Sequence, residues 1–272
     1  MKDKSHIIVY ILLGLGAIIM LFPFIWMILT SLKTIEETRQ IPPSFLPQVF
    51  MWSNYKEVFS SIPYATLYKN SFTVTVIVTA GQVFICSMAA YAFARLNFPL
   101  KNFLFFLVLT ILMVPSQVYY LPQYIIMSKI NFLDSLKAII VPSLFSAYGT
   151  FLLRQFFISL PKEVEEAAII DGCNRGSVFF RISVHLAKPG MISLAIFTML
   201  FAWNDLLWPT LVINSPSKMT IPMGITLLAT EHSTMYNLIM AGTALSTIPI
   251  LIIFVIFQKQ FVEGIALTGV KG

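Results

Sequence analysis

Long apolar runs constrain this chain more than any other feature. Four stretches carry no Lys, Arg, Asp or Glu: Ser5–Leu32, Asn70–Ala94, Asn102–Ser128 and Ser233–Gln258. An apolar run of about 20 residues is long enough to cross the hydrocarbon core of a bilayer as a helix. Only 11% of the residues are charged, too few to cover the surface of a soluble domain of this length. We therefore expect an all-α membrane protein.

Two further membrane spans are interrupted by single charges. Ala138–Leu153 is apolar and continues past Arg154, and Pro189–Ser217 contains only Asp205. Together with the four uncharged runs they predict six transmembrane helices in a single domain over residues 1–272. The predicted spans are about 7–29, 70–94, 102–126, 137–160, 189–213 and 234–258, with an outer loop over 31–69 and a cytoplasmic loop over 154–188.

The first apolar run could be a cleaved signal peptide or a retained helix. Lys2 and Lys4 precede it, as basic residues precede the apolar region of a signal peptide. However, the run exceeds the ~7–15 apolar residues of such a signal, and no small-x-small cleavage site follows it. We expect a retained transmembrane helix.

Lys and Arg are distributed unequally between the two sides of this six-span arrangement. Eleven of the 18 fall on the side that carries both termini, and seven fall on the other side. Because cytoplasmic loops of membrane proteins are enriched in these residues, both termini are predicted to be cytoplasmic. The net charge of +6 is thus explained by topology, and no basic run with interleaved aromatics indicates nucleic-acid binding.

No pattern of residues typical of an enzyme occurs in the sequence. His6, His185 and His232 are scattered, and no Gly-rich phosphate-binding loop is present. Cys86 lies in the second span and Cys173 in the cytoplasmic loop, so no disulfide is expected. We expect no catalytic residue, metal ligand or cofactor in this chain. This pattern favours a transport or channel subunit over a membrane enzyme.

The loop 154–188 has the sequence pattern of a helix–turn–helix outside the bilayer. Pro161 suits the first position of a helix, and acidic residues from Glu163 onward fall in the first two turns, where the helix dipole favours them. Gly172 can adopt the left-handed conformation that ends a helix. A second short helix is predicted over about 177–184. The loop is either an amphipathic surface connection or a docking element for a cytoplasmic partner.

The stretch "EAAIIDG" begins at Glu166 and resembles the EAA loop of ABC importer permeases, in which Glu-Ala-Ala, Gly and Ile recur at fixed spacing. The sequence departs from that pattern at Val184 and His185, where Leu-Pro is usual. Three other stretches, "AAYAFARLNFP", "FAWNDLLWP" and "FVEGIALTGVKG", resemble the carbohydrate branch of the family, with its maltose (MalG-like) permeases. The matching residues of the EAA loop are Glu166, Ala167, Ala168, Gly172 and Ile182.

The resemblance implies a sugar importer of the bacterial or archaeal cytoplasmic membrane. Its expected partners are a second homologous permease forming a heterodimer, two cytoplasmic ATPase subunits that bind ATP and Mg, and an extracytoplasmic sugar-binding protein. The alternatives are a permease for peptides or amino acids and, less favoured, a secondary transporter or channel subunit. The resemblance assigns coupling to the ATPase to Glu166, Ala167, Ala168, Asp171, Gly172 and Ile182.

Asp205 is the residue that indicates where a substrate could pass. A carboxylate near the bilayer centre costs about 2.5–3.5 kcal/mol on insertion scales, so it should face protein or water. Nearby indole and amide groups suit a sugar, which has an apolar face and many hydroxyls. The alternative is that Asp205 and Asn204 only hydrogen-bond neighbouring helices or the second permease. The pathway candidates are Trp203, Asn204 and Asp205, together with Tyr119, Tyr120 and Gln123 from the proline-broken third span.

Overall fold

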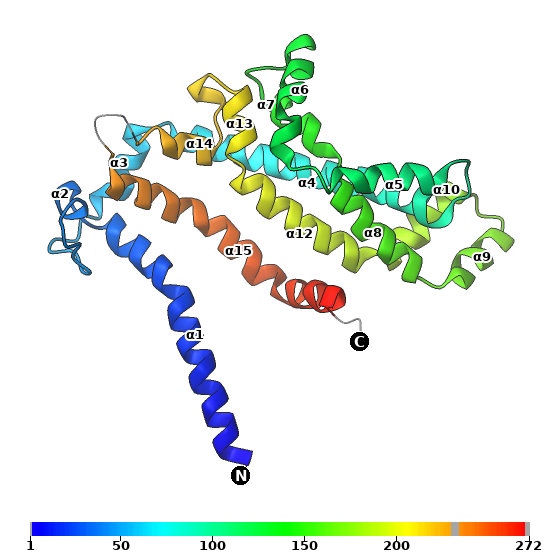
Figure 1. Cartoon of the computed structure of the whole chain (residues 1–272), viewed down its shortest axis with the longest axis horizontal. Coiled ribbons are helices and arrows are strands. Elements are labelled where there is room, and N and C mark those ends of the chain that lie inside the picture. The colour runs from blue at the N-terminus through cyan, green and yellow to red at the C-terminus, as the bar shows by residue number, and fades with distance from the viewer. Residues whose placement is uncertain (1, 230–233, 270–272) are drawn as a thin grey trace. The chain divides into compact units, whose positions relative to one another are not determined.

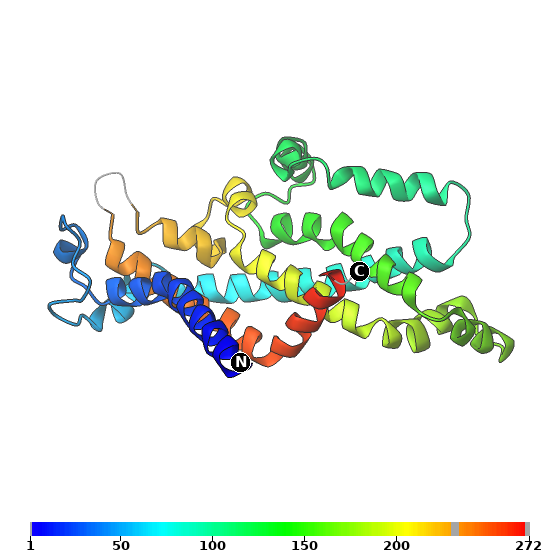
Figure 2. The same ribbon diagram turned by 60° about the horizontal axis from the view of Figure 1, so that its bottom comes forward.

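The computed structural model describes residues 2–229 and 234–269, and side chains within 9–229 and 234–258. The side chains of Lys2, Lys4 and His6, the residue His232 and the side chains of the stretch 259–272 therefore lie outside the described part. Within that part the chain is helical (Figures 1 and 2). The elements are α1 (Lys2–Ser31), α2 (Ile35–Thr38), α3 (Ser53–Ser61), α4 (Tyr64–Arg95), α5 (Lys101–Ile111), α6 (Ser116–Lys129), α7 (Leu136–Ile140), η1 (Val141–Leu144), α8 (Ala147–Ser159), α9 (Lys162–Ile170), α10 (Arg175–Val178), η2 (Phe179–Ser183), α11 (Val184–Leu186), α12 (Lys188–Asn204), α13 (Leu207–Val212), η3 (Pro216–Lys218), α14 (Ile221–Thr226) and α15 (Tyr236–Gly269).

The chain forms two compact units, which are described separately. The first unit comprises residues 1–65 and 221–250, and the second comprises residues 66–220 and 251–272. The first unit holds α1, the short helices of the predicted outer loop, α14 and the first part of α15. The second unit holds nearly all of α4 and every element from α5 to η3.

The predicted outer loop is a folded structure in the first unit. The side-chain amide of Asn54 on α3 is buried and donates to the backbone carbonyls of Ser31 and Lys33, each at 2.8 Å. Asn237 of α15 donates to the Asn54 side-chain oxygen at 3.3 Å. The Tyr64 hydroxyl donates to the Gly242 carbonyl at 2.8 Å. These buried polar contacts join the end of α1, α3 and the start of α15.

The core of the second unit lies where α4, α8 and α12 meet. Its buried members include Cys86, Leu153 and Leu194, one from each of these helices. Two glycines permit the close approach of α8 and α12. A Cβ atom on Gly149 would lie 2.9 Å from Leu194, and one on Gly190 would lie 2.5 Å from the ring of Phe156. Larger side chains there would push the helices apart.

Four stretches of helix are long and apolar enough to cross a membrane: Val9–Ser31, Tyr64–Arg95, Leu136–Ser159 and Tyr236–Gln258. Two bent pairs, Lys101–Ile111 with Ser116–Lys129 and Arg175–Leu186 with Lys188–Asn204, raise the number to six if each pair is one span. The described part of the chain therefore has four to six candidate spans.

Three predicted spans are not single helices. The third, over 102–126, bends by 102° between α5 and α6, at a break that precedes Pro115 (Figure 2). Because proline disfavours helical backbone at the residue before it, an α-helix does not continue through Val114. The fourth, over 137–160, consists of α7, η1 and α8, with extended backbone at Phe145 and Ser146. The fifth, over 189–213, ends as α12 at Asn204, and Asp205 then takes an extended conformation before α13. Alone, α12 has 17 residues, about 26 Å, slightly less than a hydrocarbon core of about 30 Å.

One predicted short helix is present with bounds somewhat different from expectation. The helix expected over 177–184 begins earlier, at Arg175, because the Asn174 side chain caps it by accepting from the Ser177 amide at 2.8 Å. This helix includes the π-helical turn η2 and ends with α11 at Leu186.

A polar tie joins two loops of the second unit, around 134 and around 215. The Asp134 carboxylate accepts hydrogen bonds from the Ser215 hydroxyl at 2.6 Å and from the amides of Ser215 and Asn214 at 2.8 and 3.0 Å. Lys218 pairs with the same carboxylate at 2.9 Å. Hydrogen bonds from Ser215, and then from Lys218 and Asn214, hold the pKa of Asp134 well below its ordinary range.

Candidate functional site

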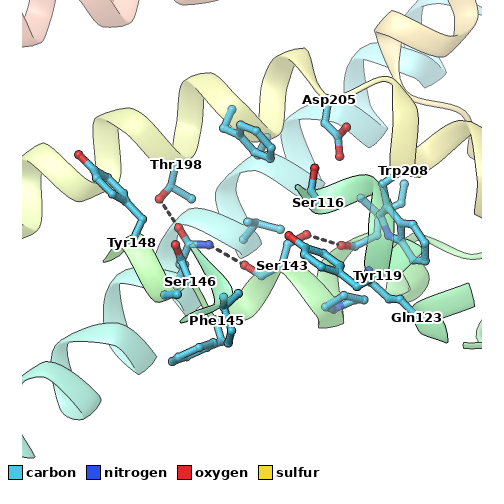
Figure 3. Close-up of a pocket in the computed structure, with 18 of the residues that line it drawn as sticks. Ser116, Tyr119, Gln123, Ser143, Phe145, Ser146, Tyr148, Thr198, Asp205 and Trp208 are labelled. Atoms are coloured by element: carbon cyan, nitrogen blue, oxygen red, sulfur yellow. Dashed lines mark hydrogen bonds between the residues drawn. The ribbon is translucent and has the colours of Figure 1, made fainter. Parts of the chain in front are cut away.

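A cavity of about 670 Å³ lies in the second unit (Figure 3). It is bounded by α4, α6, α8 and α12 and by the breaks before and after these helices. Aromatic rings form much of its wall, and one carboxylate, Asp205, is the single charged group among the lining residues. A cavity of this size, largely apolar with a few polar groups, is typical of a site for a small molecule. Its polar groups include Gln82, Ser116, Tyr119, Gln123, Ser143 and Asp205.

Gln82 is the central polar contact of the cavity wall and was not predicted from the sequence. Its amide nitrogen donates to the Ser143 carbonyl at 2.9 Å, and its amide oxygen accepts from the Thr198 hydroxyl at 2.5 Å. These bonds tie α4 to η1 and α12 (Figure 3). The signal that could have identified it is the single side-chain amide in the interior of the uncharged run Asn70–Ala94.

Asp205 lies in the break between α12 and α13 rather than within a helix. Its backbone is extended, with ψ 122°. Figure 3 shows the carboxylate on the side of the cavity where Ser116 lies. The residue therefore presents a negative charge to the cavity.

The pathway candidates divide into two groups. Tyr119, Tyr120, Gln123 and Asp205 line the cavity, as does Trp208, whose indole nitrogen donates to the Ala138 carbonyl at 2.9 Å. Trp203 and Asn204 are not among the residues that line it. Trp203 is 5% exposed and meets the Tyr68 ring edge-on at 5.5 Å. The Asn204 amide donates to Leu200 one turn earlier, at 2.8 Å.

The helix with the EAA sequence is α9, and it ends in a defined turn. Gly172 has φ +86°, the left-handed conformation expected of it. The Cys173 amide donates to the Ala168 carbonyl at 2.9 Å and the Gly172 amide to the Ile169 carbonyl at 3.0 Å. This pair of bonds is the Schellman motif, which satisfies the last carbonyls of a helix. The end of α9 is therefore fixed by its own backbone.

The coupling candidates lie on α9 and on the residues that follow it. Ala168 is buried and Ile182 is half-buried, whereas the other four candidates are exposed. Ile170 beside them is 85% exposed, and Phe180 of the following helix is 55% exposed. An exposed Ile next to small and acidic residues is the kind of surface that another protein could cover. The exposed candidates are Glu166, Ala167, Asp171 and Gly172.

The second helix of the loop is packed into the core. Phe179 is 6% exposed and contacts the rings of Tyr91 at 5.0 Å and Phe157 at 6.4 Å between centroids.

Within the described residues no three His, Cys, Asp or Glu side chains gather as metal ligands would. Cys86 and Cys173 are both free thiols.

Comparison with known proteins identifies the family of this chain. Residues 81–266 match the family described as the binding-protein-dependent transport system inner membrane component. This chain belongs to that family. The resemblance drawn from the EAA sequence is confirmed. The permease is thus a membrane subunit of a binding-protein-dependent ABC importer.

Similar proteins cover the whole length of the permease. The arabinooligosaccharides transport system permease protein AraQ of Halalkalibacterium halodurans is 34% identical, with 100% of both chains covered. The sn-glycerol-3-phosphate transport system permease protein UgpE of Yersinia pestis is 32% identical over 94% of both chains. A solved bacterial ABC transporter involved in import of the acidic polysaccharide alginate has TM-score 0.82 and 22% identity over 95% of this chain and 96% of that one. The last likeness shows the fold.

Proposed function

We propose that the permease moves a sugar or oligosaccharide into the cytoplasm. The AraQ relatives are named for arabinooligosaccharides, and they align along nearly the whole chain. The cavity adds a physical reason. The rings of Tyr119, Tyr120 and Trp208 offer faces for the apolar side of a sugar ring, and Gln123 and Asp205 offer hydrogen-bonding groups for its hydroxyls.

An uncharged sugar fits the cavity better than an anionic one. The lining residues carry one carboxylate, Asp205, and no Lys, Arg or His. A sugar phosphate or a uronate would place a second negative charge in a site of low dielectric without a cation to balance it. A phosphorylated substrate, such as the sn-glycerol-3-phosphate after which the UgpE relatives are named, is therefore the less favoured class.

The chemistry that drives transport belongs to partner subunits in this proposal. Two ATPase subunits bind ATP and Mg, a second homologous permease completes a heterodimer, and an extracytoplasmic binding protein delivers the sugar. Both termini and the loop 154–188 are cytoplasmic. The exposed face of α9, with Ile170 and the end at Gly172, supports its role as the docking element for an ATPase subunit. A rigid helix end transmits displacement because it does not deform when its partner moves.

Reconstitution of the complete transporter tests the proposed function. The permease is purified with its partner permease and ATPase subunits, inserted into liposomes and supplied with the binding protein. We expect ATP-dependent accumulation of labelled arabinooligosaccharides, and no accumulation of peptides, amino acids or glycerol phosphate. Accumulation of one of these other compounds, but not of sugars, would refute the substrate class. Sugar flux without ATP would refute the importer mechanism.

A further inference from the structure

Two buried charged residues meet where α9 contacts the end of α4. The Arg95 guanidinium lies 3.2 Å from the Glu165 carboxylate, and their side chains are only 4% and 6% exposed. Arg95 also donates to the Leu160 carbonyl at 2.6 Å. Glu165 accepts from the Ser183 hydroxyl at 3.0 Å. The pair therefore joins the last residue of α4 to the end of α8, to α9 and to the helix that follows α9.

This ion pair differs physically from the apolar contacts around it. The contact between the rings of Tyr91 and Phe179 is apolar, so separation of these rings would lose dispersion contacts but would leave no charge without a partner. Separation of Arg95 from Glu165 would instead leave two buried charges without partners, which is strongly unfavourable. The start of α9 and the end of α4 are therefore constrained to move together.

α4 also reaches the cavity, about midway along the helix, at Gln82. α4 is a continuous helix of 32 residues with no proline inside it. Thirteen positions separate Gln82 from Arg95, about 20 Å along the helix at 1.5 Å per residue. Gln82 holds Ser143 and Thr198 on two other walls of the cavity. By contrast, the backbone around Ser143 and that between α12 and α13 are not continuous α-helix at the cavity.

We propose that Arg95 is a positioning residue that fastens the docking helix α9 to α4, so that α4 carries the displacement of α9 to the polar wall of the cavity at Gln82. The inference rests on the proposed function, in which α9 docks an ATPase subunit. The chain already connects the loop directly to α8 and α12, the helices that flank it. The contact with α4 adds a second connection through which a displacement of α9 can reach the cavity. It also assigns a function to Glu165, which lies one residue before the EAA sequence and is buried away from the docking face.

The test uses the complete transporter in liposomes with four variants. Glu165→Gln removes the charge but keeps an acceptor for Ser183. Arg95→Gln/Glu165→Gln removes both charges, so that no lone buried charge remains to prevent folding. Glu163→Gln is the matched control, because Glu163 lies exposed on the same helix. Arg95→Lys tests conservative rescue, since it keeps the charge without the planar fork.

Two measurements separate positioning from a merely structural role. The first is sugar moved per ATP hydrolysed, with the apparent KM for the loaded binding protein. The second is the distance distribution between spin labels at Asn97, beyond α4, and Ile170, at the end of α9, in a background without Cys86 and Cys173. Both label positions are exposed.

We expect the double variant to assemble and hydrolyse ATP but to move several-fold less sugar per ATP, with KM unchanged and a broadened label distance. Arg95→Lys should recover part of the ratio, and Glu163→Gln should match wild type. A wild-type ratio together with a wild-type distance distribution in the double variant would overturn the inference. Absence of ATP-dependent sugar uptake by the wild type would refute the proposed function instead, and the label distances would still decide whether the pair fastens α9 to α4.

Discussion

Gly172 ends α9 in a conformation that other residues adopt only with strain, and this makes its replacement informative. At φ +86° an L-residue costs about 1–2 kcal/mol relative to Gly. A Cβ atom added there would meet no heavy atom within 4 Å, so no clash contributes. Gly172→Ala should therefore destabilise the turn by about 1–2 kcal/mol, roughly a 5- to 30-fold loss in the population of its native conformation. Gly172→Val should cost more, because branching at Cβ restricts the backbone further.

Gly176 provides the matched control four residues later. It lies inside α10, and an added Cβ would only come within 3.4 Å of the Asn174 side-chain oxygen. Ala is a better helix former than Gly by about 1 kcal/mol, so Gly176→Ala should be neutral or slightly stabilising. Gly172→Asn should keep most of the wild-type activity, because Asn tolerates the left-handed region.

The assay compares these variants in the purified complex. Gly172→Val should insert into the membrane normally but lose sugar uptake, either because the ATPase subunits no longer co-purify or because they hydrolyse ATP without transport. Thermal unfolding of the complex reports whether the loss is local. Full uptake by Gly172→Val, with ATPase subunits retained, would show that the rigid end of α9 is not part of the coupling mechanism.

Three further predictions concern topology, the cavity and pH. Single cysteines at Lys162 and Ser217 should react with membrane-impermeant reagents from opposite sides, and labelling of both from outside would refute the six-span arrangement. Asp205→Asn should change the apparent affinity or sugar preference of an assembled complex, whereas Trp203→Ala should lower assembly or thermal stability without altering preference; the reverse result would contradict the placement of these side chains. Folding lowers the pKa of Asp134, so the hydrogen bonds to its carboxylate stabilise the folded protein at pH values above the ordinary carboxyl pKa of about 4. This stabilisation is lost progressively as the pH falls below about 4. The protection factors of the amides around residue 215, that is, their exchange rates relative to the intrinsic rate at each pH, should therefore stay high at pH 5, fall toward pH 3, and lose this pH dependence in Asp134→Asn.

Much of the fold could be predicted because it depends on local chemistry. An apolar run long enough to cross a bilayer indicates a membrane helix whatever its neighbours are, and three of the four uncharged runs lie in the long helices α1, α4 and α15. Gly172 could be identified because only the local backbone determines where a left-handed residue ends a helix. Pro115 marks the bend of the third span for the same reason.

Contacts between residues far apart in the sequence could not be predicted in this way. Trp203 and Trp208 lie in one short stretch with similar chemistry, yet one packs against Tyr68 and the other lines the cavity. The break at Asp205, which separates the two tryptophans, is marked neither by a Gly nor by a Pro directly before it. The pairing of Arg95 with Glu165 joins residues that are 70 positions apart, and spacing along a sequence does not indicate such a contact.

The helix breaks around the cavity have an electrical consequence for the membrane. Backbone carbonyls and amides freed at the bend before Pro115, at Val141–Phe145 and at Asp205 need water or protein partners, because lipid supplies none. About 670 Å³ would hold on the order of 20 waters at ~30 Å³ each. With a water-filled cavity of that size, the barrier to ions across the bilayer consists only of the protein layers above and below the cavity. These two layers must block the passage of ions as well as of sugar, so they must open one after the other and never at the same time.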